Sequence, residues 1–585
     1  MELRCPPISL KPPKPLHVEY QKASPRFIFN ETNKTNFIDA LFSETAADTL
    51  NKLNDSLEKL NQASAPHIIN ETVKTVNNTF TEHIRTLASA SFKQTKVGTK
   101  KKQKNNPWFN WQARTAKCQL RKATDITSQF PSSNLIREEF YRVKGNYKKL
   151  LKKCETNYFE NLNKDIEGGK VLNWQSFKKL KQHKTNKLEF DSMDMENFEN
   201  FFSDLYSDNH KTINSSQKDS LMNAAEQFNS VPNYPDSLNK AISTHEVSST
   251  IKLLKSGKAS STDMISNELL KCLDINHLNF LTKLFNLCLD FSIYPWNESI
   301  ISPLHKKGDI SNPDNYRAIA VSSVIGKVFS TILLERLKIF KKENCPDTPN
   351  QLGFTKGAQT YDHILTMQTI AAKYKKMHKP VYAIFVDFKK AFDSVCRQAL
   401  FYKLAKTGIT GKFFNVLKHM YTNSFAYIKL SGHLSKRINI SKGTEQGHPL
   451  SPDLFKIFIS DLSPLLESFV CPKLSNINIS HLLWADDLIM LSLDPKSCQE
   501  QVNILEKYCI DWGIEVNETK TQIMIFGNDN KLNQNLEFTL SEKSLKIVDS
   551  YCYLGISLHN SGELTTAQLI LKTKAMRAFL GLSAP

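Results

Sequence analysis

The chain of 585 residues lacks the cysteine patterns that mark small stabilised domains. Its 11 cysteines are scattered and form neither a Cys-x-x-Cys pair nor a Cys/His cluster at zinc-binding spacing. The sequence therefore indicates neither a disulfide framework nor a zinc knuckle. A reducing compartment fits this cysteine usage best, because structural disulfides belong to oxidising compartments.

Long apolar runs are missing as well. No uninterrupted apolar stretch reaches the roughly 20 residues that span a membrane, and residues 1–7 lack the apolar core of a signal peptide. We find no internal repeat of solenoid period. We therefore expect an intracellular protein with no membrane partner. With 40% hydrophobic and 23% charged residues, it has the composition of a globular chain.

Acidic residues are scarce in one segment. Between residues 93 and 187 there are 24 Lys/Arg and 7 Asp/Glu, a formal charge of +17 in a chain whose total is +19. Aromatic residues such as Trp108, Phe109 and Trp111 are interspersed with these cations. Aromatic faces can stack on unpaired bases while lysines bind phosphates. The segment predicts nucleic-acid binding, the alternative being a solvated basic helix with core aromatics.

Composition divides the chain into successive parts. Residues 1–35 are rich in proline and resemble a linker or the remnant of something upstream. Residues 36–92 carry apolar residues at helical spacing, such as Leu50, Leu53 and Leu57, and predict a helical spacer. Residues 93–237 form the basic helical, nucleic-acid-binding region. From residue 238 the pattern changes to alternating strands and helices.

Two adjacent acids, Asp486 and Asp487, interrupt the apolar stretch 482–491, which should be buried. A third acid, Asp387, directly follows the apolar run 381–386. Buried carboxylates are costly unless they are paired or bind metal, and neighbouring carboxylates repel one another. The pattern predicts a hairpin tip that faces a central strand, with three carboxylates sharing two divalent cations. A turn or helix cap is the alternative for Asp387, and an exposed hairpin tip for the pair.

A loop rich in glycine and proline lies at residues 442–452. Ser451 followed by Pro452 predicts the N-cap and first turn of a helix. Gln446 and Gly447 lie in the loop itself, where we expect the backbone to approach another part of the molecule closely.

Taken together and in order, these segments resemble the reverse transcriptases of non-LTR, LINE-type retrotransposons. The resemblance begins at about residue 239 and rests on segments 308–319, 351–354, 386–393, 446–452, 484–487, 517–521 and 553–555. It implies an α+β fold of the right-hand polymerase type. Residues 238–540 would form the fingers and palm, and residues 541–585 a primer-grip hairpin and a truncated thumb. The mostly α-helical basic region would precede them.

The resemblance also implies the catalytic residues. Asp387, Asp486 and Asp487 match the catalytic acids that bind two magnesium ions, with manganese as the alternative metal. Lys520 matches a position that could protonate or steady the leaving group.

Further positions match substrate-binding residues of the family. The resemblance implies that Arg317, with Lys306 nearby, holds the incoming triphosphate. Phe392 occupies the position where a ring would exclude a 2′-hydroxyl. Gln446 and Gly447 match the residues beside the incoming nucleotide.

The activity that follows is RNA-templated DNA synthesis, in which a primer 3′-hydroxyl is extended with dNTPs. The implied partners are an RNA template, a DNA primer or target and dNTPs, in the cytoplasm and nucleus; the oligomeric state stays open. One alternative is an inactive, truncated remnant that only binds nucleic acid. Another is a maturase or telomerase-like enzyme, whose additional domains are not apparent in the sequence.

Overall fold

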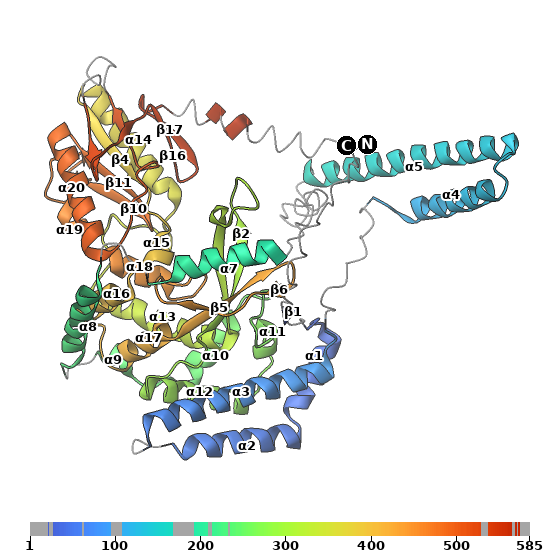
Figure 1. Cartoon of the computed structure of the whole chain (residues 1–585), viewed down its shortest axis with the longest axis horizontal. Coiled ribbons are helices and arrows are strands. Elements are labelled where there is room, and N and C mark those ends of the chain that lie inside the picture. The colour runs from blue at the N-terminus through green and yellow to red at the C-terminus, as the bar shows by residue number, and fades with distance from the viewer. Residues whose placement is uncertain are drawn as a thin grey trace, which may run out of the picture. The chain divides into compact units, whose positions relative to one another are not determined.

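The structure is a computed structural model of the whole chain (Figure 1). It describes residues 21–22, 27–60, 64–94, 108–167, 192–208, 213–231, 235–527, 536–563, 568–569 and 571–573. The chain divides into two compact units, Met1–Val97 with Phe190–Leu571 and Gly98–Glu189 with Lys572–Pro585. None of the described helices is long and apolar enough to cross a membrane.

The larger unit contains two main β-sheets (Figure 1). The first has the strand order β10-β11-β4-β12-β15, with bounds His481–Trp484, Asp487–Ser492, Val381–Val386, Gln522–Phe526 and Lys546–Ile547. The second has the order β1-β6-β5-β2-β3, with β7 paired to β5. Its strands are Gln21–Lys22, His433–Leu434, Ser424–Leu430, Glu298–His305, Tyr316–Ser322 and Ile438–Ile440. Helices and strands are therefore mixed, as the α+β prediction requires.

Strand β4 lies at the centre of the first sheet, and all six of its residues are buried. Because successive side chains of a strand point to opposite faces, its residues alternate between two cores. Tyr382, Ile384 and Val386 belong to the large core that also contains helices α13, α16, α18 and α20. The other three residues of the strand pack with α14 and with the β16–β17 hairpin. The prediction of a central strand buried on both faces is confirmed.

Helices cover both sheets. Those from the middle of the chain are α7 (Ser192–Tyr206), α8 (Ser215–Asn229), α9 (Asp236–Asn239), α10 (Thr244–Leu253), α11 (Asn267–Leu270), α12 (Ile275–Asp290), α13 (Val324–Asn344) and α14 (Thr360–Lys376). They are followed by α15 (Ala391–Ser394), α16 (Arg397–Lys406), α17 (Lys412–Thr422), α18 (Ser451–Ile459), α19 (Leu462–Leu466) and α20 (Pro495–Trp512). The C-terminal hairpins are β13–β14 (Thr539–Leu540, Lys543–Ser544) and β16–β17 (Ser550–Tyr553, Ile556–His559).

Three N-terminal helices also belong to the larger unit: α1 (Glu31–Leu41), α2 (Glu44–Glu58) and α3 (Pro66–Ser91). Helices α2 and α3 pack on α12 (Figure 1), where the rings of Phe80 and Phe280 stack with centroids 4.7 Å apart, and α1 packs on α3. The indole Nε1 of Trp296 also donates a hydrogen bond of 2.7 Å to Asn77. These helices therefore share a core with the sheets. Their apolar pattern alone did not predict that α2 and α3 would pack on α12. The predicted boundaries at residues 35, 92, 237 and 540 stay predictions.

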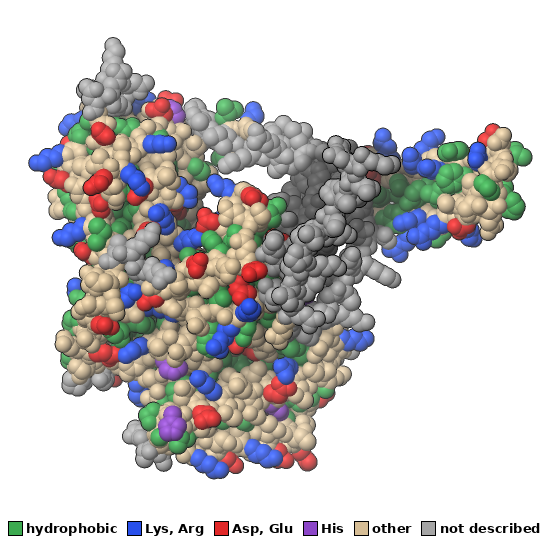
Figure 2. All heavy atoms as spheres, in the orientation of Figure 1, with side chains coloured by type: hydrophobic (Ala, Val, Ile, Leu, Met, Phe, Trp, Pro, Cys, Tyr) green, Lys and Arg blue, Asp and Glu red, His purple; other side chains and the backbone are tan. Residues whose placement is uncertain are grey.

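The second unit contains a helical hairpin, formed by α4 (Trp111–Gln129) and α5 (Asn134–Glu167). Ala113 and Cys154 are buried in it, whereas Trp111, Leu135 and Tyr141 are 72%, 80% and 65% exposed. Figure 2 shows Lys and Arg side chains exposed along the hairpin beside hydrophobic ones. The hairpin has 12 Lys/Arg and 7 Asp/Glu. The other cations of the basic segment, and residues 574–585 of the predicted thumb, lie largely outside the described residues.

Candidate active site

The three predicted acids meet at one edge of the first sheet. Strands β10 and β11 form a hairpin in which Trp484 pairs with Asp487, so Ala485 and Asp486 make its two-residue turn. Strand β11 pairs antiparallel with β4, and Leu488 lies opposite Val386. The next position along that register places Asp487 beside Asp387. The predicted hairpin tip facing a central strand is confirmed.

The carboxylates influence one another electrostatically. Loss of hydration, followed by the charge of Asp387, raises the pKa of Asp486 above its usual value, while Arg317 and Lys306 lower it. Loss of hydration and the charges of Asp486 and Asp387 raise the pKa of Asp487 to about 6. The site therefore concentrates negative charge that the protein's own groups do not fully compensate.

We tested whether this site suits a divalent cation. Within the described parts of the chain, no three His, Cys, Asp or Glu side chains already converge into a metal-binding group. The donors are nevertheless carboxylate oxygens, the ligands that Mg²⁺ prefers. Loss of hydration and then mutual repulsion raise the pKa of both Asp486 and Asp487, and a bound cation relieves that repulsion. By their donor chemistry, Asp387, Asp486 and Asp487 suit such an ion.

A distant segment holds the turn that carries Asp486. The backbone nitrogens of Ala485 and Gly353 both donate to Oε1 of Gln351 at 3.0 Å, and Nε2 of Gln351 donates to the Ala485 carbonyl at 3.3 Å. Ala485 has a φ of 60°, a left-handed conformation that costs energy for alanine. A Cβ added to Gly353 would lie 2.2 Å from the Ala485 nitrogen. Gln351 and Gly353 therefore determine where the turn lies.

Asp387 is held from the opposite side of β4. Its backbone nitrogen donates to the Thr521 hydroxyl at 3.2 Å, and its carbonyl accepts from the nitrogen of Asn517 at 2.7 Å. Nζ of Lys520 lies 3.4 Å from Oδ2 of Asp387. The predicted leaving-group lysine is therefore beside the first acid, on a side chain that is 67% exposed.

The predicted triphosphate-binding cations belong to the β2–β3 hairpin. Arg317 lies on β3 opposite Leu304, and Lys306 follows β2 and donates its backbone nitrogen to the Asn315 carbonyl at 2.8 Å. Burial lowers the pKa of Lys306, and so do the neighbouring charges of Arg317 and Lys390. Cations thus gather near the acids, as binding of a polyphosphate requires.

The glycine-rich loop attaches to β3. The Ala320 nitrogen donates to the carbonyl of Gln446 at 2.8 Å. Gly447 has a φ of +107°, and an added Cβ would lie 2.8 Å from the Ala320 carbonyl oxygen. The predicted close approach of the backbone is confirmed, and it explains why glycine is needed at this position.

Phe392 lies partly buried between two other aromatic rings. Its ring stacks on Phe455 with centroids 4.6 Å apart and makes an edge contact with Phe354 at 6.1 Å. The ring therefore belongs partly to the core, and its predicted part in sugar selection stays a prediction.

Comparison with known proteins shows which domains this part of the chain resembles. Residues 304–558 match the family model described as reverse transcriptase (RNA-dependent DNA polymerase). The chain carries a reverse transcriptase domain. The RNA-directed DNA polymerase from mobile element jockey of Drosophila melanogaster is 25% identical over 353 residues, which are 58% of this chain and 38% of that protein.

Other relatives are of the same kind. The Pol polyprotein from type-1 retrotransposable element R2 of Popillia japonica is 28% identical over 200 residues, 34% of this chain and 28% of that protein. Both relatives are thus proteins of mobile or retrotransposable elements. The chain spans 38% and 28% of the lengths of these two relatives. A Candida tropicalis telomerase structure aligns at 17% identity with a TM-score of 0.30, covering 45% of this chain and 53% of that one.

The start of α18 differs from the prediction. Ser451 is not the N-cap but the first residue of the helix, and Leu450 precedes it without a side-chain cap. The Ser451 hydroxyl instead donates to the Glu445 carbonyl at 2.7 Å. The N-cap prediction was wrong because this serine satisfies a carbonyl of the preceding loop, a contact that local sequence rules do not consider.

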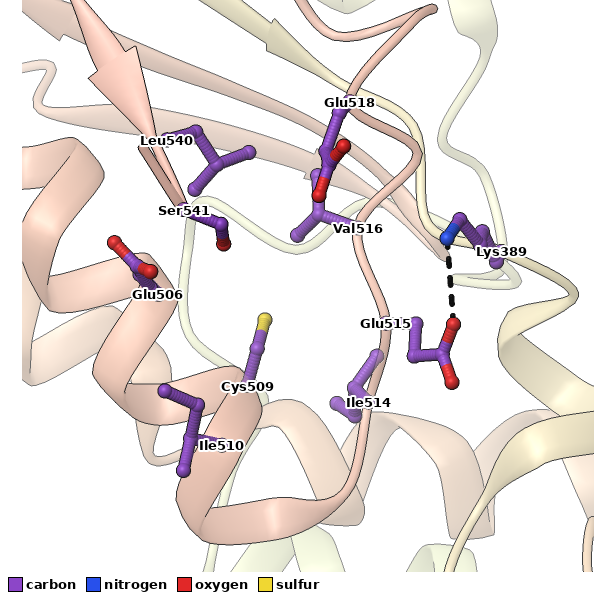
Figure 3. Close-up of a pocket in the computed structure, with 10 residues that line it drawn as sticks. All are labelled: Lys389, Glu506, Cys509, Ile510, Ile514, Glu515, Val516, Glu518, Leu540 and Ser541. Atoms are coloured by element: carbon purple, nitrogen blue, oxygen red, sulfur yellow. Dashed lines mark hydrogen bonds and ion pairs between the residues drawn. The ribbon is translucent and has the colours of Figure 1, made fainter. Parts of the chain in front are cut away.

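A cavity of about 140 Å³ lies near Asp387 but is lined by none of the three aspartates (Figure 3). Figure 3 shows Glu506, Glu515 and Glu518 around it, with Lys389 paired to Glu515 at 3.3 Å. Three glutamates would repel the phosphates of a nucleotide. This cavity is therefore a poor match for a nucleotide.

Proposed function

We propose that this chain is an RNA-templated DNA polymerase that extends a primer 3′-hydroxyl with deoxynucleoside triphosphates. The observation that carries the proposal is the meeting of Asp387, Asp486 and Asp487 at one sheet edge within the matched residues 304–558. Arg317 and Lys306 supply the positive charge that a triphosphate needs.

The three aspartates would hold two magnesium ions, which manganese could replace. Bound ions of this kind activate a hydroxyl and neutralise the leaving pyrophosphate. The carboxylates contribute oxygen ligands whose positions the β4–β11 register and the Gln351 contacts set. Burial around Asp486 strengthens every charge interaction made there.

The remaining predicted residues have separate tasks. Arg317 and Lys306 would hold the triphosphate, and Lys520 would steady the leaving group. Phe392 would exclude a ribose 2′-hydroxyl, while Gln446 and Gly447 would line the nucleotide position.

The helical hairpin of the second unit suits RNA binding. Its 12 Lys/Arg against 7 Asp/Glu, together with the exposed Trp111 and Tyr141, match a phosphate-binding and base-stacking surface. The proposed templates are RNA, the primers or targets DNA, and the setting the cytoplasm and nucleus. The alternative, a remnant that binds nucleic acid without synthesis, is not favoured because all three acids are present and lie together.

Primer extension tests the proposal. The purified chain is given poly(rA) with oligo(dT), dTTP and magnesium, and product length is measured. We expect extension that requires the divalent ion and falls about 1,000-fold or more in Asp486→Ala, since a ligand of the transferring ions is lost. Asp219→Asn, an exposed acid of α8, is the matched control and should extend normally.

Two results would count against this proposal. Undiminished synthesis by Asp486→Ala, with normal folding, would remove the acids from the reaction. Tight RNA binding by the wild type without any extension would establish the binding-only alternative.

A further inference from the structure

A fourth carboxylate, Asp393, lies near the site but outside the group of three proposed metal ligands. It belongs to the short helix α15, directly after Phe392, and is only 5% exposed. An ionised carboxylate this deeply buried is costly unless hydrogen bonds compensate it.

Both oxygens of Asp393 accept hydrogen bonds. The Tyr206 hydroxyl, at the end of α7, donates to Oδ1 at 3.3 Å. Nε2 of Gln446 donates to Oδ2 at 2.7 Å. The nearby charges of Lys390 and Lys306 also favour the ionised form, against the burial that raises the pKa of this group to about 7.

These bonds determine the orientation of the Gln446 side chain. The amide nitrogen of Gln446, which can only donate, faces the carboxylate oxygen of Asp393. The amide oxygen, which is an acceptor, is then directed away from Asp393. Since the Gln446 carbonyl is also fixed by the Ala320 nitrogen, the residue is held at both its backbone and its side chain.

The loop and α15 are tightly bound to each other around this contact. The Thr444 nitrogen donates to the Phe392 carbonyl at 2.7 Å, and the Gly443 nitrogen donates to the Val395 carbonyl at 2.8 Å. A Cβ added to Gly443 would lie 2.5 Å from the Asp393 carbonyl oxygen. The distance between Asp393 and Gln446 is therefore set by the backbone as well as by the side chains.

We propose that Asp393 is a positioning residue that turns the Gln446 carboxamide so that its acceptor oxygen faces the incoming nucleoside triphosphate. This inference rests on the proposed polymerase function. It assigns to Asp393 no contact with substrate or metal; its effect passes through Gln446. Loss of Asp393 should therefore weaken nucleotide binding in the same way as loss of Gln446.

Steady-state primer extension with dTTP tests this coupling. Asp393→Ala and Gln446→Ala should each raise KM for dTTP about 10-fold while kcat changes less, which is the scale of one charge-assisted hydrogen bond. The double variant should be no worse than Gln446→Ala, because residues that act through one contact are not additive. Ser394→Ala, the next residue of α15, is the control.

A charge exchange gives a second test that does not depend on the alanine variant folding. Gln446→Glu places two carboxylates together and should raise KM strongly. Adding Asp393→Asn restores a hydrogen bond between them, with donor and acceptor exchanged, and should return KM toward the wild-type value. A merely structural aspartate predicts no such rescue.

The outcomes are distinct. If the wild type is active, two results would overturn the positioning inference and leave the polymerase proposal standing. One is that the effects of the two alanine variants on KM are additive. The other is that Asp393→Asn does not restore KM in Gln446→Glu. A wild type that extends no primer would overturn both.

Discussion

Apolar side chains are used differently in the two units. In the larger unit all six residues of β4 are buried, and the acid that follows them lies where the two antiparallel neighbours, β11 and β12, begin. In the α4–α5 hairpin, Trp111, Leu135 and Tyr141 are 72%, 80% and 65% exposed among lysines and arginines.

This difference matches two kinds of task. Phosphoryl transfer needs groups held to within a fraction of an ångström, so its carboxylates belong on strands fixed by two cores. Binding a flexible polyanion needs charge and stacking surface without one geometry. We therefore expect the sheet edge to be rigid and the hairpin to be adaptable.

The largest difference between the sheet edge and the hairpin should come from one glycine substitution in each. Gly353→Ala forces a Cβ to within 2.2 Å of the Ala485 nitrogen and should move the turn that bears Asp486. We expect primer extension to fall about 100-fold, since small displacements at a reacting centre cost about that much, with a loss of stability of about 1–3 kcal/mol.

Gly145→Ala, in the middle of α5, is its counterpart in the hairpin. A Cβ there meets no atom within 4 Å. We expect a gain of about 0.5–1 kcal/mol in helix stability and unchanged extension, measured by melting curves and product length. Equal losses from both substitutions would remove the distinction between the units.

Phe392→Ala should alter sugar selection next most strongly. We expect ribonucleotides to be incorporated far better while deoxynucleotide use falls modestly, because the ring at this position would exclude a 2′-hydroxyl. The ratio of rNTP to dNTP incorporation is measured beside a melting curve. Phe401→Ala, a buried ring of α16, should cost roughly 3–5 kcal/mol without changing the ratio. An unchanged ratio in Phe392→Ala with a comparable stability loss would assign the ring to the core alone.

Removal of positive charge from the α4–α5 hairpin should lower the affinity for RNA moderately and make that affinity less dependent on salt. Lys148, Lys149, Lys152 and Lys153 are exposed on α5. Changing all four to Gln should reduce the slope of log affinity for single-stranded RNA against log salt by up to about 3, at roughly 0.7 per lost phosphate contact. Extension at saturating template should persist.

A matched set of lysines in the larger unit controls for total charge. Lys252, Lys338, Lys342 and Lys376 are also exposed, and the same change there should leave the slope nearly unaltered. Deleting residues 98–189 should weaken RNA binding further than the four changes on α5. If the deletion alters neither affinity nor slope, the hairpin does not bind the RNA.

The smallest expected effect is a pH-dependent difference in melting temperature between Asp487→Asn and the wild type. The pKa of Asp487 is raised to about 6, so the folded protein binds more protons than the unfolded chain as pH falls from about 6 toward 4. Its ionised form therefore destabilises the metal-free protein above pH 6. Asp487→Asn should melt above the wild type at pH 7, and this difference should shrink at pH 5. Magnesium should also reduce this difference in melting temperature, because it stabilises the wild type. An equal difference at pH 7 and pH 5 would contradict the repulsion between Asp487 and its neighbouring carboxylates.

Much of the sheet edge could be predicted from the sequence, because its signals are local. Six apolar residues before Asp387, and apolar runs on both sides of Asp486, predicted a buried strand and a hairpin turn, and both are present. The α+β fold and the close backbone approach at Gly447 were also predicted correctly. The assignment of catalytic roles stays a prediction.

The supporting contacts could not be predicted, because they join residues distant in the chain. Gln351 holds Ala485 across 134 positions, and Tyr206 reaches Asp393 across 187. Ser451 was assigned as an N-cap from its neighbours, but its hydroxyl is committed to Glu445. Asp393 carried a visible signal, an acid within the apolar surroundings of residues 391–396, yet only the fold shows that it faces Gln446.

The close approach of Gly353 to Ala485 also bears on which related sequences can keep this turn. The turn that carries Asp486 depends on Gly353, where any side chain would collide with the Ala485 backbone. A related sequence that keeps the three aspartates but carries a side chain at this position should therefore lose most of its primer extension. When related sequences are compared for competence in DNA synthesis, positions 351 and 353 should accordingly be read together with the three aspartates.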